Sequence, residues 1–169
     1  MTLKKNIIAF FIIGILGTVG HFLYDWTGEN YFIGLFFPVN ESTWEHLKLL
    51  FFPTLIYSTA EYVLLKEKPK NYIPAVIYSV ICGMMIILVL FYSVRGILGY
   101  NVDFINIGIY YISIIVMLFK KRKFITQEKF STDTAKWIFI SIGIFIAILF
   151  FIWSYNPPNL GIFIPPKSS

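Results

Sequence analysis

Long apolar runs, separated by short polar segments, follow one another along the chain. A helix needs about 20 apolar residues to cross the hydrocarbon core of a bilayer, and five runs approach or reach that length. They cover residues 7–23, 44–65, 72–94, 104–119 and 137–155. Another apolar run, residues 31–38, is too short to cross, so we expect it to lie at the membrane interface or to re-enter between helices. The pattern predicts an all-α integral membrane bundle of five transmembrane helices, forming a single domain over residues 1–169.

The two ends of the chain need separate interpretation. Lys4 and Lys5 precede the first apolar run, as positive residues precede the apolar part of a signal peptide. His21 near its end, and Asp25 and Trp26 just after it, stand where a signal peptide would have a small-residue cleavage site, so we interpret the run as a retained membrane anchor. The C-terminal residues 156–169 contain four prolines and are not expected to be helical throughout.

The composition also indicates a membrane protein. Apolar residues make up 57% of the 169 residues and charged residues only 14%, whereas an average soluble domain carries about 25% charged residues. A chain this short leaves much of its surface exposed after folding, so the apolar excess predicts the lipid bilayer as its partner. The net charge of +5 does not indicate nucleic-acid binding, because the positive residues lie in short clusters between the apolar runs.

The positive clusters predict an orientation. Eleven Lys and Arg residues lie before the first run, between the second and third runs, and between the fourth and fifth runs, and three lie on the opposite side: Lys48, Arg95 and Lys167. Cytoplasmic loops of membrane proteins carry an excess of Lys and Arg. The sequence therefore predicts a multi-pass protein of the plasma membrane with a cytoplasmic N-terminus and an extracytoplasmic C-terminus.

Ionisable side chains at membrane depth point to function, and most of them lie at the outer ends of the first two predicted helices. His21 and Asp25 are four residues apart and therefore share a helix face. The same face continues through the small residues Gly14, Gly17 and Thr18, which let a neighbouring helix approach closely. We therefore expect this face to point into the bundle.

The other half of the predicted site is the run P-V-N-E-S-T-W-E-H-L-K at residues 38–48, which leads directly into the second helix. Its imidazole and carboxylates suit either a divalent cation that activates water or a general acid–base pair. No other cofactor is indicated. The predicted catalytic residues are His21, Asp25, Glu41 and His46. The predicted metal ligands are His21, Asp25, Glu41, Glu45 and His46.

A structural interpretation accounts for some of the same residues. Ser42 and Glu45 fit a capping box, in which Ser42 caps the helix and Glu45 reaches back to it. His21 and Asp25 can form a hydrogen-bonded pair that fixes the first helix. This interpretation gives no role to Glu41 or His46.

Three further polar features lie inside the predicted helices. Glu61, near the inner end of the second helix, is either a paired carboxylate or part of a proton relay. Pro53 is expected to kink that helix and to release the carbonyl of Leu49. A polar stripe on the fourth helix is expected to face the bundle interior; it consists of Asp103, Asn106, Tyr110 and Ser113.

The stretch HFLYDW, followed by PVNESTWEHLK, resembles a family of small bacterial membrane proteins classed as a domain of unknown function. The resemblance is clear over residues 20–53 and weaker at residues 156–158. It implies a polytopic bacterial membrane protein and carries no established activity.

Three functions remain open on the sequence alone. The first is an accessory or assembly protein whose polar cluster fixes the bundle or docks a membrane partner protein. The second is a membrane-embedded enzyme, with or without a metal, that acts on a lipid headgroup or a lipid-linked substrate. The third is an ion or small-solute transport component, with the polar stripes along its path.

Overall fold

The computed structural model describes residues 3–166, and these residues form helices and connecting segments without a strand. Five helices are long: α1 (Leu3–Trp26), α3 (Thr43–Leu64), α4 (Tyr72–Leu98), α5 (Asp103–Thr126) and α6 (Asp133–Tyr155). Two are short: α2 (Tyr31–Phe36) and the 3₁₀ turn η1 (Gly161–Phe163). The predicted all-α class is therefore confirmed. Lys167, which was counted on the outer side, lies outside the described residues.

The long helices correspond to the five apolar runs, and most extend beyond them by a few residues. Helices α1, α4, α5 and α6 are long and apolar enough to cross a membrane. Helix α3 is not among these four, because it carries Glu45, Lys48 and Glu61 within its 22 residues. The short run at residues 31–38 forms α2, which Asn30 caps by accepting backbone N–H bonds from Phe32 and Ile33.

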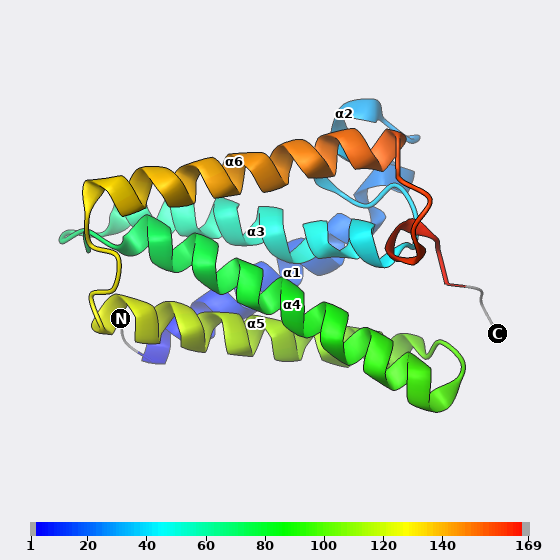
Figure 1. The fold of residues 1–169 in the computed structure, drawn as a ribbon, viewed down its shortest axis with the longest axis horizontal. Coiled ribbons are helices and arrows are strands. Elements are labelled where there is room, and N and C mark those ends of the chain that lie inside the picture. Colours follow the sequence, from blue (N-terminus) through cyan, green and yellow to red (C-terminus); the bar gives the residue numbers. More distant parts are fainter. Residues whose placement is uncertain (1–2, 167–169) are drawn as a thin grey trace.

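Helix α3 can be polar because it is the central helix of the bundle. It packs against α1, α4 and α6 (Figure 1). Residues 47–54 of α3 are all buried, and Leu50 and Phe51 have no exposed surface. Charged groups on such a helix meet protein partners instead of lipid.

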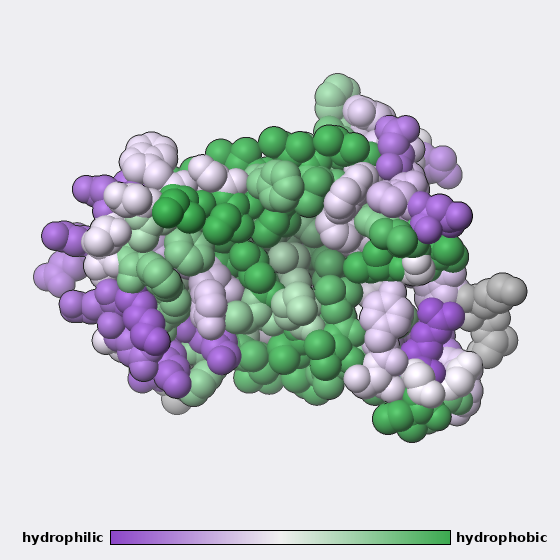
Figure 2. Space-filling model, in the orientation of Figure 1, coloured by the Kyte–Doolittle hydropathy of each residue, from purple (hydrophilic) through white to green (hydrophobic). Residues whose placement is uncertain are grey.

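The two ends of the bundle are polar and its middle is apolar. Figure 2 shows a hydrophobic belt across the middle of the molecule, with hydrophilic residues gathered at both ends. The start of α1 and the α3–α4 and α5–α6 connections lie at one end, and α2, the α4–α5 connection and η1 lie at the other (Figure 1). This arrangement brings the polar C-terminal end of α1 and the polar N-terminal end of α3 together.

Small residues on α1 allow a close approach to α3 and α5, as the sequence predicted. A methyl group added at Gly17 would lie 2.7 Å from the backbone oxygen of Leu49 and would overlap the hydroxyl of Tyr110. That hydroxyl is 3.2 Å from the Leu49 oxygen and 3.1 Å from the Ile13 oxygen, and it can donate to either. Tyr110 thus supplies a donor to the carbonyl that Pro53 leaves free.

We expect Gly17→Ala to lower the free energy of unfolding by about 1–3 kcal/mol, because an added methyl overpacks this contact. Thermal unfolding in one detergent measures the effect. The matched control is Gly108→Ala on α5, where an added methyl meets no atom within 4 Å and Ala is the better helix former. Equal stability of the two variants would contradict the close approach.

Glu61 is a paired carboxylate, which is one of the two roles that the sequence allowed for it. Its Oε2 accepts hydrogen bonds from Lys121 Nζ at 2.6 Å and from the Tyr72 hydroxyl at 2.5 Å. Lys121 Nζ also donates to Ser58 Oγ at 3.2 Å. This buried group joins α3, α4 and α5 near the end that holds the basic connections.

Candidate functional site

The segment before α3 is held by its own side chains, which fixes the direction of Glu41. Ser42 caps α3 by accepting the backbone N–H of Glu45 at 3.3 Å. Asn40 Oδ1 accepts the backbone N–H of Ser42 at 2.9 Å, which closes a tight Asx turn around Glu41. Glu45 reaches back to the N–H of Val39 at 3.0 Å and not to Ser42, so the capping box is only half formed.

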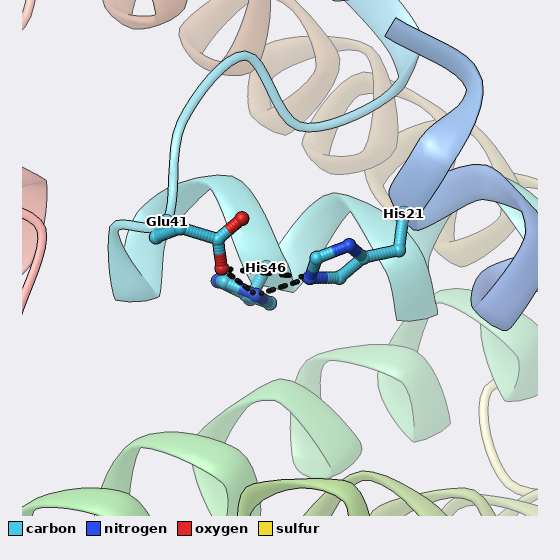
Figure 3. A group of neighbouring side chains, drawn as sticks. All are labelled: His21, Glu41 and His46. Carbon is cyan, nitrogen blue, oxygen red and sulfur yellow. Dashed lines mark hydrogen bonds and ion pairs between the residues drawn. The ribbon is translucent and has the colours of Figure 1, made fainter. Parts of the chain in front are cut away.

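Three side chains from three segments meet at this turn. His21 comes from α1, Glu41 from the connecting segment and His46 from α3 (Figure 3). The two imidazole Nε2 atoms are 3.1 Å apart. Glu41 Oε2 lies 3.5 Å from Nε2 of His21 and 3.4 Å from Nε2 of His46. These three residues are the group that could hold a metal ion in the described part of the chain.

The contact made by Nδ1 of His46 shows which of its two ring nitrogens carries the proton in the neutral side chain. Nδ1 lies 2.9 Å from the backbone oxygen of Ser42, which can only accept a hydrogen bond. Nδ1 therefore carries the proton, and neutral His46 presents an unprotonated Nε2 to His21 and Glu41. Metal-binding histidines are commonly oriented in this way, by an N–H bond to a carbonyl or carboxylate.

The three distances suit a zinc-sized ion. Bonds of about 2.0–2.1 Å with tetrahedral angles place ligand atoms roughly 3.3 Å apart, and the three separations are 3.1, 3.4 and 3.5 Å. An octahedral ion with similar bonds places neighbouring ligand atoms about 3.0 Å apart, and the 3.1 Å contact fits that arrangement as well. Two imidazoles and one carboxylate are also a common zinc ligand set.

The carboxylate is ionised and ready to bind a cation. The hydrogen bond with His21 holds the pKa of the Glu41 carboxyl well below its usual range. Its side chain is 65% exposed. Glu41 therefore carries a negative charge at neutral pH while remaining reachable from outside.

A family model covers residues 1–167 of this chain. The chain belongs to DUF6512, a family of unknown function. The resemblance to an uncharacterised family is thereby confirmed, and the bacterial origin that it implied stays a prediction. No curated protein and no solved structure matches this DUF6512 chain significantly.

The group of His21, Glu41 and His46 in the DUF6512 chain lies on the wall of a pocket between α1, α3, α4 and α5. The pocket has a volume of about 640 Å³, within the range of small-molecule sites. Asn101, Asp103 and Asn106 line it at the start of α5. Leu49 and Phe91 contribute apolar surface. Three of the four residues of the polar stripe predicted on the fourth helix, Asp103, Asn106 and Tyr110, thus border the same pocket as the two histidines. Asp103 is exposed there, and Ser113 is buried instead.

Two of the predicted site residues of the DUF6512 chain are not part of the three-residue group. Asp25 shares a helix face with His21 but lies near the end of α1 and is exposed. Glu45 points to the opposite side of α3, where its Oε2 accepts from Lys48 Nζ at 2.7 Å and its Oε1 accepts from Ser154 Oγ at 3.0 Å.

The Glu45–Lys48 pair holds α2 on the bundle. Both side chains are at least 99% buried. Lys48 Nζ also donates to the backbone oxygen of Gly34 at 2.7 Å, which ties α2 to α3. The sequence predicted Glu45 as a helix cap and a metal ligand, although its three-residue spacing from Lys48 on a helix is the pattern of an ion pair.

Proposed function

We propose that this chain is a five-span membrane protein with a metal-dependent hydrolase site at its outer end, acting on a lipid or lipid-linked substrate. The observation that carries the proposal is the convergence of His21, Glu41 and His46 beside an amphipathic pocket. The membrane arrangement, the metal and the substrate are supported separately below.

Five spans are supported by the central position of α3. The helix has 22 residues and runs through a bundle whose other four long helices can each cross a membrane. Lys121 and Lys48 are buried in ion pairs. If these two buried lysines are left out of the charge count, ten of the eleven positive residues remain on the inner side and two of the three remain on the outer side. The proposed orientation therefore keeps the N-terminus in the cytoplasm and the site outside.

Catalytic use of the metal is supported by the ligand count. Structural zinc sites have four protein ligands, whereas catalytic sites have three and keep one position for water or substrate. His21, Glu41 and His46 provide three, and they border the pocket. An ion held there would polarise a carbonyl and make a bound water more acidic.

A lipid substrate is supported by the chemistry of the pocket wall. Apolar side chains such as Leu49, Ile87 and Phe91 offer contact to a hydrocarbon chain, while Asn101 and Asn106 offer hydrogen bonds to a polar group. Phe22 and Ile107 line the pocket and are 46% and 59% exposed, so they lie where lipid would surround the bundle. A lipid could therefore enter sideways.

The proposed hydrolysis has two steps, cleavage of a bond by water and transfer of a proton. The water oxygen bonds to the carbonyl carbon of an ester or amide, and the bond from that carbon to the leaving oxygen or nitrogen breaks. One proton of the water must move to the leaving group. Asp103 is the carboxylate on the pocket wall outside the three-residue group, and we assign this proton transfer to it.

The test measures fatty-acid release by mass spectrometry from a monoacylglycerol and an N-acyl amine, each supplied to zinc-loaded protein in detergent micelles. Asp103→Asn is expected to keep bound zinc and to lose at least about 100-fold in turnover. Glu29→Gln, a change at an exposed carboxylate of the same outer region, is the control and is expected to keep both. Zinc binding without turnover on either lipid would instead favour an accessory role, and stoichiometric iron would point to oxygen chemistry.

A further inference from the structure

A second hollow lies between α1 and α5, at the opposite end of these helices from the histidine site. Its volume is about 580 Å³. Phe10, Phe11, Ile115 and Phe119 form apolar walls along the two helices. We call this hollow the inner groove. It shares no residue with the pocket beside His21 and His46.

Polar groups gather at one end of the inner groove. Arg122 and Lys123 line it, and both are exposed. Asn6, on the facing helix, also lines the groove, and its side-chain oxygen is buried without a hydrogen-bond partner among the described residues. A buried amide oxygen without a partner is costly, so this side chain favours a ligand that can bond to it.

The two cations here are not used by the protein itself. Lys121, their neighbour in sequence, is buried and paired with Glu61 at 2.6 Å. No salt bridge to Arg122 or Lys123 occurs among the described residues. Their positive charge is therefore available to a ligand, directly beside an apolar surface.

We propose that the inner groove binds one anionic phospholipid. The lipid phosphate would lie between Arg122 and Lys123, the headgroup would reach the Asn6 amide, and one acyl chain would lie along Phe10, Phe11 and Ile115. Arg suits phosphate because its planar guanidinium donates two parallel hydrogen bonds. Basic pockets between membrane helices favour anionic headgroups because the ion contacts are made at the edge of the low-dielectric core.

A bound phospholipid would contact both α1 and α5 and would stabilise their packing. These helices also frame the histidine pocket, since α1 supplies His21 and α5 supplies Asp103. The proposal does not rest on a metal or on hydrolysis, because the two sites have no residue in common. It rests only on the groove and on a membrane setting.

The experiment measures binding of phosphatidylglycerol and phosphatidylcholine to the purified full chain by native mass spectrometry from detergent. Phosphatidylglycerol is expected to bind about 30-fold more tightly than phosphatidylcholine, because the choline cation of the latter offsets the attraction of its phosphate to the two positive side chains. The double variant R122Q/K123Q is expected to lose this preference. The control K66Q/K70Q removes two exposed lysines from the α3–α4 connection and is expected to keep it.

Three results would overturn the proposal. Equal binding of the two lipids by the parent chain would show that the groove does not select anionic headgroups, and this comparison needs no variant to fold. Loss of the preference in K66Q/K70Q as well would assign it to general charge. Thermal stabilisation of the protein by inorganic phosphate to the same extent as by phosphatidylglycerol would show that the acyl chain has no part.

Discussion

His46→Ala is expected to lower the zinc affinity of the purified chain by at least about 100-fold. The side chain removed carries one of the three proposed ligand atoms, which lie 3.1–3.5 Å apart. Loss of an outer-shell partner alone costs about 10–100-fold in metal affinity, so loss of a ligand should cost at least the upper value. Competition with a chromophoric chelator at neutral pH measures the affinity.

The same experiment includes His21→Ala and Glu41→Gln, which should each lose affinity similarly because they supply the other two ligands. Glu29→Gln is again the matched control, because Glu29 is an exposed carboxylate outside the group. Unchanged zinc binding in all three ligand variants would remove the proposed metal centre. Zinc binding by none of the proteins, the parent included, would do the same.

Lys48→Met is expected to lower the free energy of unfolding by about 3–5 kcal/mol, the usual cost of breaking a buried ion pair by removing one partner. The substitution leaves Glu45 as an unpaired charge that is 99% buried, and it removes the donor to the Gly34 carbonyl. Thermal or denaturant unfolding in detergent measures the loss. Because this pair ties α2 and the preceding turn to α3, zinc affinity should fall as well.

The control for this prediction is the double variant E45Q/K48M, in which no charge is left buried. It should recover part of the lost stability, since a neutral Gln can still bond with the Val39 N–H or the Ser154 hydroxyl that Glu45 engages. If K48M alone is as stable as the parent chain, the ion pair does not hold α2 on α3.

The residues around the start of α3 show how far helical spacing can predict a site. The sequence placed Glu41 and Glu45 together in one predicted set of metal ligands. The helix begins at Thr43, and Glu41 lies in the turn that Asn40 closes. Its carboxylate therefore turns toward His46, while Glu45 and Lys48 point to the other side of α3.

Asp25 gives the complementary case. Its four-residue distance from His21 places both on one face of α1, and that face does meet the bundle at Gly17. One turn further along the same face, Asp25 is exposed. A helix face is predicted well by periodicity, but where along that face the packing ends depends on the lengths and tilts of neighbouring helices.

The sequence by itself determined the five long helices and the level at which the polar residues gather, because run length, charge and hydrophobic pattern act locally along the chain. Only the tertiary structure decided that α3 is enclosed by the other helices, and that His21, Glu41 and His46 meet while Glu45 does not. These contacts join residues from separate segments. They depend on how closely α1 approaches α3 at Gly17 and on the turn before α3, which no local pattern specifies.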